Sequence, residues 1–98
     1  MARQSVVRTV GLNNTNAMQI AGPSPKRVGI LFVPANAGRY TISTENVITI
    51  DMGPTLQTSG PTIEITIEKH GELVQRAWYG LGSAAGATFA GVIEIFEE

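Results

Sequence analysis

The chain contains no cysteine and only one histidine among its 98 residues. Without cysteine, a disulfide framework, a thiolate metal site and a thiol nucleophile are all excluded. A single histidine cannot make a two-histidine metal site, and it leaves no spare member for a nucleophile–histidine–acid arrangement. We therefore expect a protein that is not an enzyme and that binds no metal ion and no cofactor.

Charged side chains are also scarce. They make up 15% of the chain, against about a quarter in typical domains. Seven Lys and Arg nearly balance eight Asp and Glu, for a formal net charge of -1. That balance offers no electrostatic footprint for nucleic acid or anionic lipid, so we expect neither as a partner. The weakly charged surface has two explanations: it is partly covered in use, or it is the Thr-rich exterior of a compact β domain.

Long apolar runs are missing as well. No stretch approaches the roughly twenty residues of a membrane-crossing helix, and no apolar segment of signal-peptide length follows residues 1–5. We expect a soluble protein made in the cytoplasm. Because no linker-like run divides the chain, residues 16–98 are assigned to a single β domain. Residues 1–15 are assigned to a first strand or to an N-terminal arm.

Strand-like segments recur about every ten residues, each closed by Gly, Pro or Asn. This spacing predicts an all-β fold: a small antiparallel β-sandwich or β-barrel, jelly-roll-like, with about eight strands and no substantial helix. The expected strands are residues 3–10, 17–21, 26–33, 39–44, 47–50, 62–69, 74–81 and 87–96. Residues 55–58 are either a brief edge strand or irregular chain.

Two hairpins are expected from strands that follow each other in the sequence. Residues 39–44 and 47–50 would pair through a Glu-Asn turn, which is a weaker turn signal than Asn-Gly. Residues 62–69 alternate between isoleucine and polar side chains, as a half-buried strand does. They would pair with residues 74–81 through a turn at residues 70–72.

Two of the expected strands are apolar on both faces. Residues 26–33 are apolar almost throughout, which predicts a central strand. Residues 87–96 place Ile93 and Ile95 on one face and Ala90 and Val92 on the other. Such a strand is either central in its sheet or covered by a neighbouring subunit.

Few side chains are candidates for a functional site, and each also has a structural explanation. His70 is placed in an exposed turn. Trp78 and Tyr79 could stack on a sugar or a base, although a large aromatic in a small β domain is more often part of the core. Arg27 and Arg39 could bridge to carboxylates of a partner, or could lie along the edge of the core.

The acidic and glycine-rich segments point to no chemistry. On one strand, Glu64 and Glu68 would be about 13 Å apart, too far for the paired carboxylates of a glycosidase. Glu94 and the two glutamates that end the chain are interpreted as solubilising, with a salt bridge to a neighbouring chain as the alternative. The glycines of residues 80–86 lack the Lys-Ser/Thr ending of a phosphate loop and are interpreted as a loop between strands.

The order of the segments carries more information than any single residue. A polar-apolar strand, Asn16-Ala17-Met18-Gln19-Ile20, precedes a Pro-x-Arg turn and an apolar strand in residues 23–32. A Gly-aromatic segment, residues 38–43, and an isoleucine-alternating strand, residues 61–68, follow. Trp78, a Gly/Ala/Ser loop at residues 82–86 and the closing strand Val92-Ile93-Glu94 complete the pattern. Over residues 16–96, this order resembles that of small bacteriophage virion proteins.

The resemblance implies a small β-sandwich or β-barrel component of the virion, on the capsid surface or at the base of a head or tail fibre. Residues 1–15 would be an extra arm that docks onto the capsid or swaps into an adjacent subunit. We therefore expect a head-stabilising capsid decoration protein on the virion surface. Its partner would be the major capsid protein or another virion protein.

Such a protein would bind as a homo-oligomer, because a thin core and an apolar last strand suit a chain that completes its burial in an assembly. A homotrimer is favoured, since capsid surfaces offer threefold positions where several weak contacts act together. The alternative function is a tail or fibre module that binds host glycan on Trp78 or Tyr79.

Overall fold

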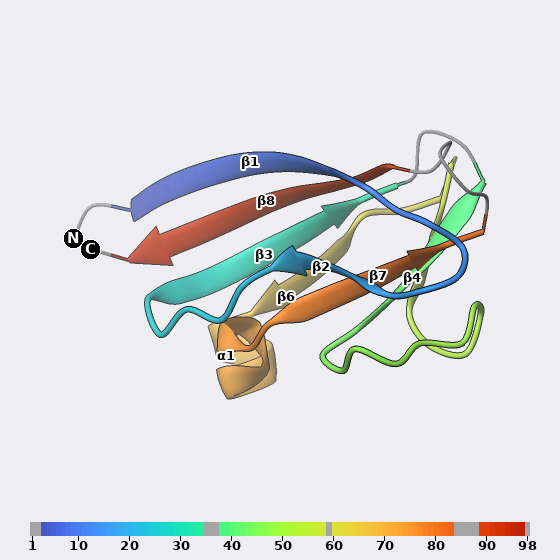
Figure 1. Cartoon of the computed structure of the whole chain (residues 1–98). Coiled ribbons are helices and arrows are strands. Elements are labelled where there is room, and N and C mark those ends of the chain that lie inside the picture. Colours follow the sequence, from blue (N-terminus) through green and yellow to red (C-terminus); the bar gives the residue numbers. More distant parts are fainter. Residues whose placement is uncertain (1–2, 35–37, 59, 84–88, 98) are drawn as a thin grey trace.

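The computed structural model describes residues 3–34, 38–58, 60–83 and 89–97. Within them, eight strands form two four-stranded antiparallel sheets (Figure 1). The strands are β1 (Arg3–Gly11), β2 (Met18–Ala21), β3 (Arg27–Val33), β4 (Arg39–Ser43), β5 (Thr55–Gln57), β6 (Ile63–Thr66), β7 (Trp78–Gly82) and β8 (Phe89–Glu97). The predicted small antiparallel β-sandwich is confirmed.

The strands pair in a nested order. One sheet runs β1-β8-β3-β6 and the other runs β2-β7-β4-β5. The first strand therefore pairs with the last, the second with the seventh, the third with the sixth and the fourth with the fifth. Because successive pairs alternate between the two sheets, the topology is that of a jelly roll. Residues 3–11, at the start of the chain, form an edge strand of the first sheet.

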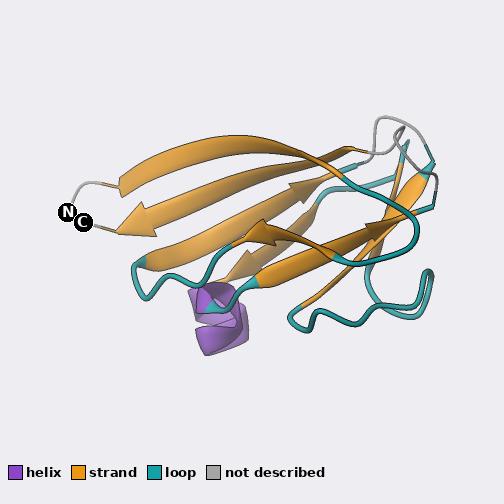
Figure 2. Ribbon diagram, viewed as in Figure 1, coloured by secondary structure: helices purple, strands orange, loops and turns teal. Residues whose placement is uncertain are grey.

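Among the described residues, one short helical segment connects β6 to β7 (Figure 2). It consists of α1 (Ile67–His70) and the 3₁₀ turn η1 (Gly71–Gln75). Within the described residues, no helix has the length and the apolar character needed to cross a membrane.

The core lies between the two sheets and is built from aromatic and β-branched side chains. The ring of Phe32 on β3 lies 5.3 Å from that of Trp78 on β7, with an angle of 58° between their planes. Tyr40 on β4 is fully buried, and its hydroxyl donates a hydrogen bond to the Val33 carbonyl on the opposite sheet. Burial raises the pKa of Tyr40, so the hydroxyl keeps its proton and this link between the sheets persists.

The predicted hairpin between residues 62–69 and 74–81 is wrong. Strand β6 stops at Thr66 and pairs with β3, whereas β7 belongs to the other sheet. The chain becomes helical at Ile67, because the Thr66 hydroxyl accepts a hydrogen bond of 3.3 Å from the Lys69 amide and caps the helix. Gly71, with φ of 60°, ends it. The isoleucine pattern continued across this boundary because Ile67 also packs against the core.

Replacing Thr66 with alanine is expected to lower the free energy of unfolding by about 1 kcal/mol, because the Lys69 amide loses its capping partner. Chemical denaturation measures this loss. Thr66→Ser keeps the hydroxyl and is the matched control, expected to stay close to the unmodified protein. Equal stability of the two variants would mean that the cap contributes nothing.

The predicted hairpin between residues 39–44 and 47–50 is also wrong. Residues 47–50 form no strand, and β4 pairs instead with β5, where Tyr40 lies opposite Leu56. Residues 55–57 are thus a brief edge strand, which was one of the two interpretations. The intervening chain, the 44–54 loop, returns over the sheet, where the Asp51 amide donates to the Thr41 hydroxyl at 2.9 Å.

The two strands with apolar character on both faces occupy the middle of one sheet. β3 lies between β8 and β6, as predicted, and β8 lies between β1 and β3. The central position accounts for one apolar face of each strand, the face that meets the second sheet. The other face points away from the core.

Candidate protein interaction surface

The outward face of the β1-β8-β3-β6 sheet carries apolar side chains where solvent-facing sheets usually carry polar ones. Residues opposite each other in neighbouring strands share a face, so the register sorts inward from outward positions. Val7, Ile93, Leu31 and Glu64 form one outward row across all four strands. The apolar members of this and the adjoining rows, termed the outer apolar face, are Val7, Leu31, Val33, Phe89, Ile93 and Ile95.

The outer apolar face is open to solvent in the described part of the chain. Val7 is 72% exposed, Val33 and Phe89 are also exposed, and the remaining three members are half-buried. Two glycines keep the face flat, because the neighbouring side chains lie over them. A Cβ atom on Gly91 would come within 3.2 Å of the Val33 Cβ, and one on Gly29 within 3.4 Å of the Ile95 Cδ1. A flat apolar sheet face of this kind suits contact with another protein.

The inward face of the same sheet holds a buried ion pair. Arg27 and Glu94 are each 1% exposed, and the Arg27 Nη2 lies 3.1 Å from the Glu94 Oε1. The second carboxylate oxygen of Glu94 accepts from the Arg8 Nε at 3.2 Å. The interpretation of Glu94 as a solubilising end is therefore wrong, because its place in the strand points it into the core.

Arg27 also donates hydrogen bonds to the backbone carbonyls of several connecting segments. Its Nη1 donates to the carbonyls of Val74 and Arg76, each at 3.0 Å, and its Nη2 donates to the Gly22 carbonyl. Burial lowers the pKa of the guanidinium, whereas the nearby Glu94 carboxylate acts in the opposite direction. Arg27 thus joins β3, β8 and η1 within one chain. It is fully buried, whereas the sequence suggested a position at the edge of the core or a bridge to a partner.

Arg39 also bridges to a carboxylate of its own chain. Its Nε and Nη2 donate to the two carboxylate oxygens of Asp51, each at 2.7 Å. Asp51 has φ of 66°, a left-handed conformation that is uncommon outside glycine. The pair therefore holds the 44–54 loop against β4.

Low pH is expected to release the 44–54 loop. The hydrogen bonds from Arg39 lower the pKa of Asp51. Stabilisation from a carboxylate with a lowered pKa is present above the ordinary Asp value of about 3.9 and is lost as the pH falls through the lowered value. Hydrogen exchange at the Asp51 amide, corrected for the intrinsic pH dependence of exchange, should accelerate in that range. The acceleration should be missing in Asp51→Asn, and its persistence there would assign it to another group.

The aromatic candidates are mainly structural. Trp78 is only 6% exposed, and its Nε1 donates to the Leu73 carbonyl at 3.1 Å, which confirms the core interpretation. Tyr79 is half-buried on β7, opposite Gln19 and Ser43. Trp78 therefore offers only a small part of its ring to a ligand.

The titratable candidates are not brought together. His70 ends α1 rather than occupying a hairpin turn, and its Nδ1 accepts from the Thr66 amide at 3.1 Å. Glu64 lies on β6 whereas Glu68 lies in α1, so the two never share a strand. The first three residues of the glycine-rich segment 80–86 belong to β7, not to a loop, and residues 84–86 lie outside the described residues.

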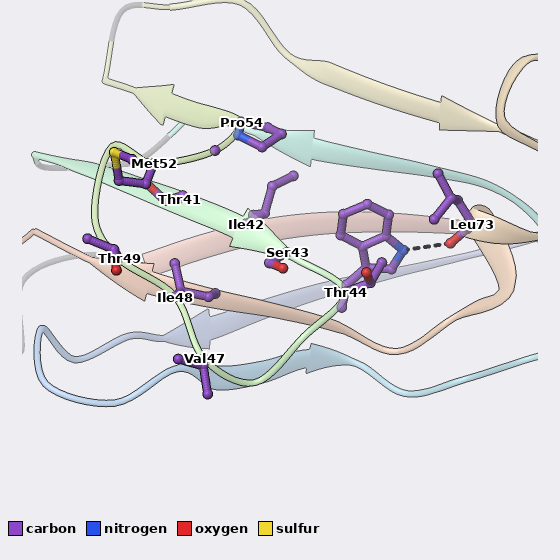
Figure 3. Close-up of a pocket in the computed structure, with 12 residues that line it drawn as sticks. Thr41, Ile42, Ser43, Thr44, Val47, Ile48, Thr49, Met52, Pro54 and Leu73 are labelled. Atoms are coloured by element: carbon purple, nitrogen blue, oxygen red, sulfur yellow. Dashed lines mark hydrogen bonds between the residues drawn. The ribbon is translucent and has the colours of Figure 1, made fainter.

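A hollow of about 420 Å³ lies between the 44–54 loop and the sheet (Figure 3). Val47 and Met52 stand at its rim, 81% and 79% exposed. It is lined by Thr41, Ile42, Ser43, Thr44, Val47, Ile48, Thr49, Met52, Gly53, Pro54, Leu73 and Trp78. The lining offers hydroxyl groups and apolar surface but no charged side chain, so it holds no general acid or base.

The sequence indicated two apolar faces on β3 and β8, but it did not indicate which of the two points outward. It missed the part played by Val7, whose strand was treated as a possible arm.

Among the described residues, no group of three or more His, Cys, Asp and Glu side chains is placed to hold a metal ion. No protein-family model, no curated protein and no solved structure matches this chain.

Proposed function

We propose that this chain is a non-enzymatic structural protein of a bacteriophage virion, a capsid decoration protein that binds the major capsid protein as an oligomer. The observation that carries the proposal is the outer apolar face. An apolar side chain that is fully exposed contributes about 1.5–3 kcal/mol when a partner buries it, and the half-buried members of this face would contribute less.

Ion pairs within the chain support a structural role. Glu94 pairs with Arg8 and Arg27, which holds β1, β3 and β8 together, and Arg39 pairs with Asp51, which holds the 44–54 loop. The hollow under that loop lacks titratable groups. A jelly roll is a fold that capsid proteins use, among other proteins, so the fold is compatible with the proposal without deciding it.

The order of segments along the chain resembles that of small virion proteins. This resemblance is the reason for proposing that the protein is located on the virion. Repetition would add strength: several copies on a capsid surface, as in the homotrimer that threefold positions favour, would bind more tightly than one. Synthesis in the host cytoplasm would precede attachment.

Co-sedimentation tests this proposal. The purified protein is mixed with purified, expanded capsids of the phage that encodes it, and the pellet is examined for a saturable, fixed ratio of this chain to capsid protein. We expect saturation at a ratio set by capsid symmetry. A protein that stays in the supernatant at all concentrations, and that is missing from purified particles, would contradict the proposal.

The alternative, a host-glycan module, has weaker support. It needs an accessible aromatic platform, yet Trp78 is buried with its ring nitrogen hydrogen-bonded to Leu73. Only Tyr79 remains, and it is half-buried. We therefore retain the structural role.

A further inference from the structure

The described strands leave one long sheet edge open. The edge strands are β1 with nine residues, β2 and β6 with four each, and β5 with three. Proteins usually protect edges with short strands, prolines, bulges or inward charges. β1 is long, has no proline and pairs with β8 along its whole length without a register shift. Its inward-pointing Arg8 is already paired with Glu94.

The hydrogen-bonding groups on the open edge can be identified from the far side of β8. The Glu97 amide donates to the Lys26 carbonyl at 2.9 Å. The backbone amide and carbonyl of Glu97 therefore point toward β3 and away from β1. In an antiparallel pair, two opposite residues direct their backbone amides and carbonyls either toward each other or away from each other. The two arrangements alternate along the strands. Arg3, which lies opposite Glu97, therefore directs its amide and carbonyl away from β8. By alternation, Ser5, Val7 and Thr9 do the same.

We propose that a second copy of this chain occupies the edge, with the two β1 strands paired antiparallel about a twofold axis at Val7. Val7 is the midpoint of β1, it is the most exposed apolar residue of the strand, and its amide and carbonyl lie on the open edge. About this axis, Arg3 lies opposite the partner's Gly11 and Ser5 opposite the partner's Thr9. All nine residues of the strand pair, with no overhang.

The side chains suit the same register. On the outward side, Val7 covers the partner's Val7, and the hydroxyls of Ser5 and the partner's Thr9 can hydrogen-bond. On the inward side, Arg8 lies opposite the partner's Val6, so no two arginines face each other directly. A shift by two residues in either direction would leave residues unpaired at the ends and would remove Val7 from the axis.

The pairing would join two sheets into one, with the outer apolar faces of both copies side by side. This inference rests on the proposed function in one respect, namely that the joined outer apolar faces bind the capsid. Together they would present twice the area to it. The pairing itself is a property of the purified protein. It gives a dimer, whereas a trimer would need a contact other than a β1 twofold.

Single-cysteine variants test the register, since the chain has no cysteine of its own. Paired residues with facing backbone groups have Cα atoms about 5.5 Å apart, within the range of about 4.4–6.8 Å that a disulfide spans. We expect Val7→Cys to form a disulfide-linked dimer on mild oxidation. Thr9→Cys alone should not, but an equimolar mixture of Ser5→Cys and Thr9→Cys should. Gln57→Cys, on the exposed short edge β5, is the control for random collision.

A proline variant tests the edge without disturbing the fold. Proline at Val7 removes an amide that points away from β8, so the native ladder keeps its bonds. Val7→Pro should retain the strand signal in circular dichroism and weaken dimerisation at least tenfold in light scattering. Val6→Pro, which removes an amide facing β8, should instead destabilise the monomer.

Three results would overturn the inference. They are a monomeric protein, a trimer in which Val7→Cys does not cross-link, or dimerisation unchanged by Val7→Pro. A monomer whose β1 amides become protected only on the capsid would show that a capsid strand occupies the edge. A monomeric protein would also remove the oligomer from the proposed function, but capsid binding would survive each of these results, because co-sedimentation measures it separately.

Discussion

Replacing Glu94 with leucine should lower the free energy of unfolding by about 3–5 kcal/mol. The substitution leaves the buried Arg27 guanidinium without the carboxylate that lies 3.1 Å away. Domains of this size are stable by about 5–15 kcal/mol in total, so the variant should unfold at a much lower urea concentration. The fluorescence of Trp78, buried against Phe32, reports the transition.

The double variant Arg27→Met/Glu94→Leu removes both charges and should recover part of the loss, because no buried charge is then left unpaired. The recovery should be incomplete, because the carbonyls of Gly22, Val74 and Arg76 lose their donor. Glu97→Leu changes a carboxylate on the same strand that is only half-buried, and its effect should stay within about 0.5 kcal/mol. Should Glu94→Leu unfold at the same urea concentration as the unmodified protein, the ion pair would contribute nothing to stability.

Replacing Leu31 and Ile93 together with lysine should weaken capsid binding by at least about 100-fold. Both residues lie in the central row of the outer apolar face. Leu31 and Ile93 are half-buried in the monomer, so the contact would bury only the rest of each side chain. A lysine charge left unpaired in such a contact, however, costs several kcal/mol, which exceeds the roughly 2.7 kcal/mol that a 100-fold change in affinity requires. Titration of the variant in the co-sedimentation experiment measures the effect.

The matched control is Gln57→Lys, an exposed position on β5 of the other sheet, which should bind as the unmodified protein does. Thermal melting of both variants separates loss of binding from loss of fold, since outward positions tolerate lysine. Unchanged capsid affinity of the Leu31/Ile93 variant would show that the outer apolar face is not the contact surface.

The existence of most strands could be predicted from the sequence, because alternation and turn residues are local signals. Pairing partners could not. β4 turns back to β5 across the 44–54 loop, which is held by the contacts of Asp51 with Arg39 and Thr41. These contacts join residues about ten positions apart, and no periodic pattern contains them.

The start of the helix at Ile67 was signalled by Thr66 as a cap, by acid in the first turn and by Gly71 after the last. The isoleucine alternation outweighed these signals, because Ile67 packs against the core from a helix as it would from a strand.

The candidate surface was half-visible in the sequence. The apolar face of Ile93 and Ile95 is plain from alternation, but alternation alone does not say which face of a strand meets the core. Glu94 lies on the face that does, because Arg27, 67 positions earlier, supplies its counter-charge. An ion pair between residues so far apart in the sequence forms only in the folded structure, and no local pattern indicates it. For that reason the sequence suggested that Glu94 was a solvent-exposed, solubilising residue.

The nested strand order has a consequence for synthesis. Among the described strands, β1 is synthesised before the others, yet its native neighbour β8 is synthesised after all of them. At about 5–20 residues per second, the interval between them is roughly 4–20 s. During that time β1 lacks the strand of its own chain with which it pairs, and an unpaired strand is prone to wrong associations. The β1-β8-β3-β6 sheet therefore cannot close before β8 has emerged, and a chaperone that shields extended segments should raise the yield of folded protein more than one that acts on collapsed intermediates.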